Sequence, residues 1–67
     1  MEGTVKHIVV DRGFGFISVQ GGDDLFFHFK DLEPGLEWND QLTQRRVTFT
    51  TETTVKGLRA KNIQAAD

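Results

Sequence analysis

Two short aromatic runs constrain the fold of this chain more than any other feature. One is Phe14-Gly15-Phe16-Ile17 and the other is Leu25-Phe26-Phe27-His28-Phe29, and together they hold five of the six phenylalanines. Side chains alternate along a strand, so Phe14 and Phe16 share one face and Ile17 lies on the other. Both faces of each run are therefore apolar.

A glycine-rich connection, Gln20-Gly21-Gly22-Asp23, joins the two runs and favours a β-hairpin. The hairpin would bring Phe26 and His28 beside Phe14 and Phe16, because residues on one face of paired strands lie next to each other. These four side chains would then form one flat patch.

The position of that patch, in the core or on the surface, follows from the space available. Phenylalanine is usually buried, but a chain of 67 residues has only one small core to fill. Aliphatic residues and the other phenylalanines can fill it: Val5, Ile17, Val19, Leu25, Phe27, Val47, Phe49 and Ile63. We therefore expect Phe14, Phe16 and Phe26 to be exposed, as a platform on which bases can stack.

Several blocks of the sequence resemble the cold-shock domain family. They are Gly3-Thr4-Val5-Lys6, Arg12-Gly13-Phe14-Gly15-Phe16-Ile17, Asp24-Leu25-Phe26-Phe27-His28-Phe29 and Lys56-Gly57-Leu58-Arg59-Ala60-Lys61-Asn62-Ile63. The resemblance spans nearly the whole chain and implies a single cold-shock-like domain over residues 1–67. It also implies binding of single-stranded RNA or DNA, and a role as an RNA chaperone or a regulator of transcription or translation.

The pattern of strand-forming residues and turns agrees with that resemblance. Strands are predicted over residues 3–10, 14–19, 24–29, 47–51 and 58–63. Residues 30–43 form a long connection with one helical turn near residues 30–32. Five short strands without a long helix predict an all-β fold, a small antiparallel barrel, and the resemblance implies the OB-type version.

Composition limits the class of function. Eight basic and ten acidic residues give a net charge of −2, which argues against broad adhesion to duplex DNA but not against stacking on single strands. With no cysteine, two separated histidines and no phosphate-binding lysine after the glycines, we expect no enzyme activity, no metal and no cofactor. No apolar run reaches membrane-spanning length, so we expect a cytoplasmic protein without membrane contact.

Candidate nucleic-acid-binding residues come from both aromatic runs and from nearby cations. They are Lys6, His7, Arg12, Phe14, Phe16, Phe26, His28, Phe29, Trp38, Arg59 and Lys61. The cations are candidates for phosphate or base-edge contacts, although a solvated surface role is an equal alternative for each one. His28 can stack on a base or donate a hydrogen bond to it.

Two aromatic positions are ambiguous. Alternation points Phe29 inward, whereas the family resemblance places the matching aromatic at the rim of the binding face. Trp38, the only tryptophan, is either a hydrophobic plug packed with Leu36 or Leu42 or a base contact, and the sequence weighs the two equally.

The chain also departs from the family pattern. His7 and Ile8 stand where the family usually has tryptophan and phenylalanine, which removes one or two stacking rings. Two rival functions use the same patch: a protein-interaction barrel that binds a partner, and a dimer interface. We expect a monomer that binds nucleic acid.

Overall fold

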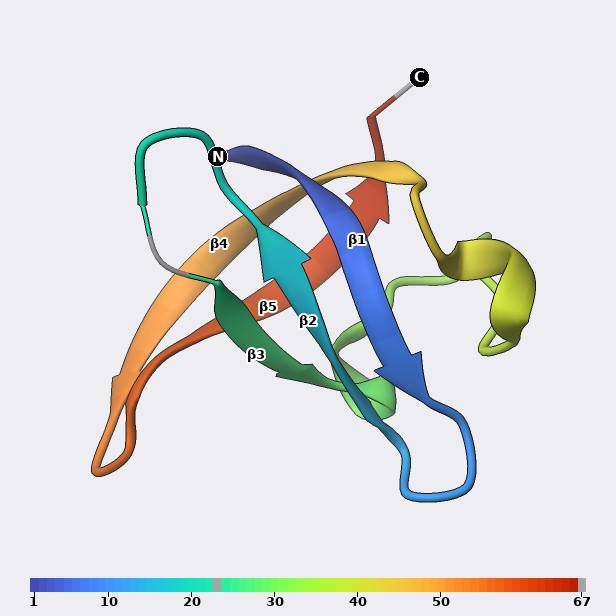
Figure 1. The fold of residues 1–67 in the computed structure, drawn as a ribbon, viewed down its shortest axis with the longest axis horizontal. Coiled ribbons are helices and arrows are strands. Elements are labelled where there is room, and N and C mark those ends of the chain that lie inside the picture. The colour runs from blue at the N-terminus through green and yellow to red at the C-terminus, as the bar shows by residue number, and fades with distance from the viewer. Residues whose placement is uncertain (23, 67) are drawn as a thin grey trace.

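The structure, a computed structural model, describes residues 1–22 and 24–66. These residues form strands β1 (Glu2–Val9), β2 (Phe14–Ser18), β3 (Leu25–His28), β4 (Arg46–Thr54) and β5 (Gly57–Ala65) (Figure 1). The connection between β3 and β4 contains two 3-10 turns, η1 (Phe29–Asp31) and η2 (Asp40–Leu42). All the predicted strands are present, and η1 is the predicted turn, whereas η2 was not predicted. Asp23 of the predicted hairpin and Asp67 of the expected domain lie outside the described residues.

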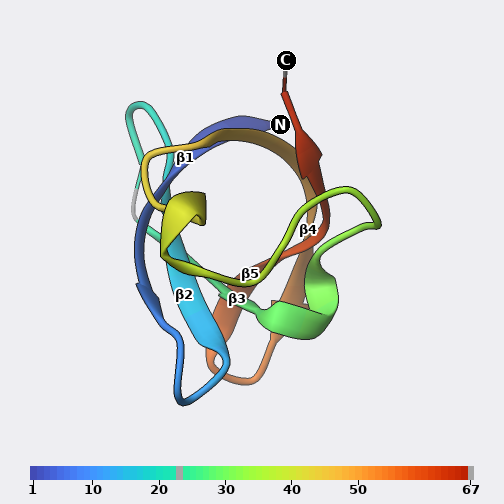
Figure 2. The same cartoon turned by 90° about the vertical axis from the view of Figure 1, so that its right-hand side faces the viewer.

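The strands close into a barrel in the order β1-β2-β3-β5-β4, with β4 pairing back onto β1. Figure 2 looks into this ring. The pairings of β1 with β2, β2 with β3, β1 with β4 and β4 with β5 are antiparallel, and β3 meets β5 in parallel at Phe26 and Arg59. The predicted all-β, five-stranded barrel of OB type is therefore confirmed. Its predicted antiparallel pairing holds at every contact except that of β3 with β5, two strands that are not consecutive in the chain.

A β-bulge in β1 determines which side chains of that strand reach solvent. The register against β2 shifts between Val5 and His7, so one extra residue is inserted into the alternation. As a result Lys6 and His7 are both exposed, while Val5 before them and Ile8 after them are buried.

The core consists of ten buried apolar residues inside the ring: Val5, Ile8, Ile17, Leu25, Phe27, Leu42, Val47, Phe49, Ala60 and Ile63. Seven of the eight predicted core residues are among them, and the eighth, Val19, is partly buried against the cluster. Leu42 comes from η2, which lies across one end of the ring in Figure 2. The core is thus filled without any ring of Phe14, Phe16 or Phe26.

Gly15 allows β1, β2 and Phe27 to approach closely at the centre of the sheet. A Cβ at this position would lie 2.7 Å from the His7 carbonyl oxygen and 2.9 Å from Cε1 of Phe27. We expect Gly15→Ala to lower the free energy of unfolding by about 1–3 kcal/mol, since neither backbone nor a packed core ring can yield easily.

Chemical denaturation measures this effect, with Gly22→Ala as the control. A Cβ at Gly22 would meet only a methyl group of Val19, at 3.1 Å, so the control should change stability little. Equal stability of the two variants would contradict the close approach at Gly15.

Candidate nucleic-acid interface

Three phenylalanine rings from β2 and β3 lie together on the outer face of the barrel. The register places Phe16 opposite Phe26, and Phe14 opposite His28. Ring centroids are 6.0 Å apart for Phe14 and Phe16, 5.6 Å for Phe14 and Phe26, and 6.1 Å for Phe16 and Phe26. We call these three rings the aromatic surface.

The aromatic surface is accessible to solvent. Phe26 is 37% exposed, and Phe14 and Phe16 are half-buried by each other and by their neighbours. The next residue, Phe27, is fully buried. Adjacent phenylalanines of β3 therefore have opposite environments, because successive side chains of a strand point to opposite faces.

A single row of side chains crosses four strands through this surface. His7 of β1 pairs with Phe16 of β2, Phe16 pairs with Phe26 of β3, and Phe26 pairs with Arg59 of β5. The row thus has a planar ring or guanidinium group on each strand that it crosses. Of the two positions where the family usually has aromatics, only His7 belongs to this face, because Ile8 is in the core.

His28 and Phe29 continue the aromatic side chains toward the barrel rim. Nδ1 of His28 accepts a hydrogen bond from the backbone N–H of Lys30 at 3.2 Å, which leaves Nε2 as the N–H donor of a neutral ring. The rings of His28 and Phe29 are 4.7 Å apart. Phe29 is 43% exposed, so its inward position expected from alternation is wrong. Strand β3 ends at His28, and alternation ends with it.

Trp38 lies between the core and this rim. Its ring packs edge-on against Phe27 at 5.9 Å and lies 6.1 Å from Phe29. Nε1 donates a hydrogen bond to the Val10 carbonyl at 3.2 Å. The side chain is half-buried, so it covers the core from the long loop and still has a free edge beside Phe29.

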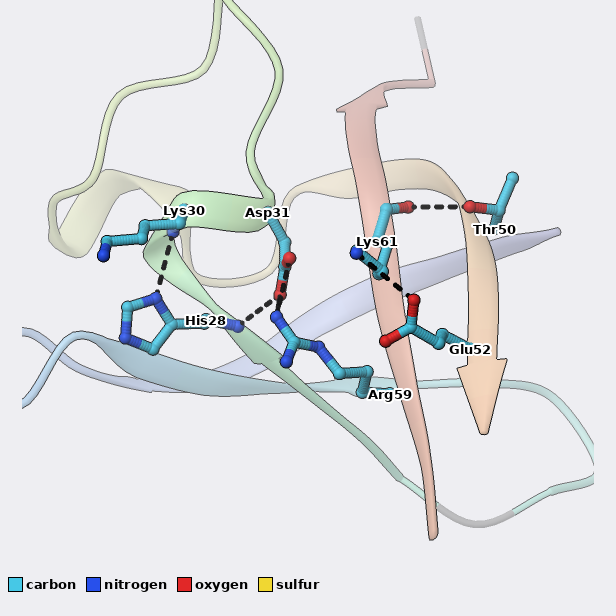
Figure 3. Close-up of polar contacts among 7 residues, drawn as sticks. All are labelled: His28, Lys30, Asp31, Thr50, Glu52, Arg59 and Lys61. Atoms are coloured by element: carbon cyan, nitrogen blue, oxygen red, sulfur yellow. Dashed lines mark hydrogen bonds and ion pairs between the residues drawn. The ribbon is translucent and has the colours of Figure 1, made fainter. Parts of the chain in front are cut away.

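Asp31 connects Arg59 to the end of β3 (Figure 3). Nη2 of Arg59 donates to both carboxylate oxygens of Asp31 at 2.8 Å, and the backbone N–H of His28 donates to the same carboxylate at 2.9 Å. The side chain of Asp31 is only 4% exposed, and that of Arg59 is 30% exposed. The carboxylate therefore fixes both the guanidinium and the backbone at His28.

Most cations near the aromatic surface already have a carboxylate partner. Nζ of Lys6 lies 3.0 Å from Asp24, and Nζ of Lys61 lies 3.3 Å from Glu52 (the latter in Figure 3). Arg12 is exposed, and its side chain makes no hydrogen bond or ion pair within residues 1–22 and 24–66. The positive electrostatic field near the three rings is thus weaker than the number of lysines and arginines implies.

Removal of Asp24 provides a test of this neutralisation. We expect Asp24→Asn to tighten binding of a single-stranded oligonucleotide about two- to fivefold at low salt, because Lys6 becomes free to contact a phosphate. The slope of log K against log salt should steepen by about 0.7, the value for one additional phosphate contact on a single strand.

Glu2→Gln is the matched control, because it makes the same change in net charge but breaks the Glu2–Arg46 pair outside the aromatic surface. Fluorescence anisotropy at several salt concentrations compares the two variants. An equal gain in both would assign the effect to net charge and not to Lys6.

Sequence reasoning did not identify Asp31 or Asp24 as part of this region. The spacing of His28 and Asp31, with a carboxylate three residues after a turn-initiating residue, is a capping signal that could have indicated the first. Among the described residues, no group of three or more histidine, aspartate or glutamate side chains could hold a metal ion. No helix in that part of the chain is long and apolar enough to cross a membrane.

A small closed barrel of OB topology with accessible rings on the β2–β3 face belongs to a class of barrels that bind oligonucleotides. Comparison with known proteins identifies the family within this class. Residues 1–66 match the model of the "'Cold-shock' DNA-binding domain". The chain belongs to this family, whose members bind single-stranded nucleic acids and are not enzymes.

Three curated bacterial relatives illustrate the similarity. The chain is 38% identical to cold shock protein CspC of Bacillus subtilis over 97% of both chains. It is 38% identical to cold shock-like protein CspB of Escherichia coli, over 100% of this chain and 94% of the relative. Identity to cold shock-like protein CspA of Shewanella violacea is 42%, over 94% of this chain and 90% of the relative.

Proposed function

We propose that this protein binds single-stranded RNA or DNA by stacking unpaired bases on Phe14, Phe16 and Phe26. The observation that supports this most strongly is the position of the three rings. They contact one another at 5.6–6.1 Å on the outer face, while ten other residues complete the core. Apolar rings left accessible in this way favour a ligand with flat apolar faces.

The charge distribution favours stacking over phosphate contacts as the source of affinity. Stacking supplies about 1–3 kcal/mol for each base and works with every base, since each has a π face. Lys6 and Lys61 are already paired with carboxylates, and the net charge is −2. The stacking contribution should therefore be tolerant of sequence, and binding should be only modestly sensitive to salt.

Further roles are proposed for the residues around the rings. His28 donates from Nε2 to a base edge, and Phe29 with the free edge of Trp38 extends the stacking path at the rim. Arg12 contacts the sugar–phosphate backbone of the bound nucleic acid. By binding only unpaired strands, the protein shifts RNA hairpins toward the open form by mass action. This is the activity of an RNA chaperone, and it also allows regulation of transcription or translation in the cytoplasm.

The ring at position 7 sets part of the affinity. His7 lies next to Phe16 in the cross-strand row, and a larger ring there would give one more base a stacking partner. We expect His7→Trp to tighten oligonucleotide binding about tenfold, from about 1–3 kcal/mol of added stacking. His7→Ala should weaken binding slightly. If tryptophan gives no gain in an anisotropy titration, position 7 does not contact the bound strand.

The proposed function is tested by titrating a labelled single-stranded oligothymidylate and the matching duplex at low and at moderate salt. We expect saturable binding of the single strand that weakens modestly with salt, and much weaker binding of the duplex. Equal binding of both, or a steep salt dependence, would indicate phosphate contacts in place of stacking. No binding of the oligothymidylate or of its RNA counterpart would reject the proposal.

A further inference from the structure

Arg59 stands at the end of the cross-strand row, beside the ring on which a base would stack. It pairs with Phe26 where β3 meets β5. The two side chains line one recess on the outer face together with residues of the β4–β5 hairpin. The recess residues are Phe26, Thr54, Val55, Lys56, Leu58 and Arg59. A flat ring that lies on Phe26 in this recess would have Arg59 at its edge.

The guanidinium of Arg59 is held in a fixed orientation. Nη2 donates to both oxygens of Asp31 at 2.8 Å, and Asp31 is itself held by the backbone N–H of His28. Nε is buried without a hydrogen-bond partner in the described structure. Figure 3 shows the other terminal nitrogen, Nη1, pointing away from Asp31. It makes no hydrogen bond to any described residue.

The ion pair makes Arg59 better suited to a base edge than to a phosphate. Bidentate phosphate binding uses two nitrogens of the guanidinium fork, and here Nη2 is already occupied by Asp31. The carboxylate also offsets the positive charge that would attract a phosphate. What remains is an oriented N–H donor with no acceptor atom, since arginine can only donate.

We propose that Arg59, fixed by Asp31, gives a base preference at the position stacked on Phe26. At that position the protein binds a base with a carbonyl oxygen at its edge more tightly than adenine. Guanine, uracil and thymine present such an oxygen, whereas adenine presents an amino group at the equivalent position and would oppose donor to donor. The inference rests on the proposed function and adds a base preference to it. A rigidly held N–H donor discriminates well between these bases because it cannot turn away from the amino group of adenine.

The test compares labelled hexamers of deoxyinosine and deoxyadenosine. The two purines have similar stacking faces, but inosine has a carbonyl oxygen where adenine has its amino group. We expect the wild-type protein to bind the inosine hexamer about tenfold more tightly, the effect of one hydrogen bond to a charged donor. Fluorescence anisotropy gives both dissociation constants under the same conditions.

The variant that removes the donor is Asp31→Asn combined with Arg59→Met, which leaves no buried charge unpaired. The ratio of its two affinities should fall to about one, whereas Gln64→Ala, an exposed change on the same strand, should keep the wild-type ratio. A second variant, Asp31→Asn with Arg59→Gln, replaces the ion pair by two amides. Glutamine can both donate and accept a hydrogen bond, so the ratio of affinities for the inosine and adenosine hexamers should fall in this variant as well. Circular dichroism confirms that each variant is folded.

The outcomes separate this inference from the function on which it rests. Binding of both hexamers with equal affinity by the wild type would overturn the base preference and leave stacking intact. A wild-type ratio of the two affinities in the double variants would also overturn the base preference. So would an equal loss of affinity for both hexamers in these variants, because a phosphate contact affects both hexamers alike. Failure to bind either hexamer or any other single strand would overturn both proposals.

Discussion

Phe26→Ala should weaken single-strand binding by about tenfold to a hundredfold, the equivalent of about 1–3 kcal/mol for one lost stacking partner. The same change should lower the free energy of unfolding by only about 1 kcal/mol, because the ring is 37% exposed. Phe26 lies at the centre of the cross-strand row and contacts both Phe14 and Phe16, so its loss should affect binding more than that of a peripheral ring.

The neighbouring phenylalanine gives the matched comparison for stability. Phe27 is fully buried and touches Trp38, so Phe27→Ala should cost about 3–5 kcal/mol. A domain of this size often has no more than about 3–5 kcal/mol of stability in total, and the variant should be largely unfolded. Gln64→Ala, an exposed change at the far end of β5, serves as the control for binding. Wild-type affinity in a folded Phe26→Ala variant would remove the stacking model.

Arg59→Met should be the most destabilising change at any cation near the aromatic surface. It leaves the carboxylate of Asp31, with a side chain 4% exposed, buried without its counter-ion. Breaking a buried pair in this way costs about 3–5 kcal/mol. Lys61→Met removes an ion pair whose members are far more exposed, so it should cost at most about 1 kcal/mol.

Urea denaturation of the two methionine variants measures this difference. Adding Asp31→Asn to Arg59→Met should restore much of the lost stability, because no buried charge is then left unpaired, and the asparagine can still accept the hydrogen bond from His28. Equal stability of Arg59→Met and Lys61→Met would show that Asp31 does not depend on its partner.

The central hairpin could be predicted from the sequence because its information is local. Alternation along residues 14–18 and 25–28, together with the glycines between them, determined which phenylalanines share a face. The apolar residues available for the core then determined which face is outside. Phe29 was predicted wrongly by alternation because the chain leaves the strand at His28, a boundary that periodicity does not define.

Three features of the candidate site depend on contacts that are distant in sequence. The parallel meeting of β3 and β5 places Arg59 beside Phe26, and no hairpin rule predicts that register. The partner of Arg59, Asp31, is 28 residues away. The bulge that exposes both Lys6 and His7 has no glycine or proline at the site of the register shift to mark it. These features depend on how the five strands pair in the closed barrel, and not on the local sequence.

The most direct test of stacking on Phe14, Phe16 and Phe26 is an NMR titration of the protein, labelled in its phenylalanine rings, with a single-stranded oligonucleotide. Bases stacked on the rings should shift the ring-proton resonances of these three residues upfield, while Phe27 and Phe49 in the core should change little. Saturable binding without shifts of the three exposed rings, or with the largest shifts elsewhere on the barrel, would contradict the account.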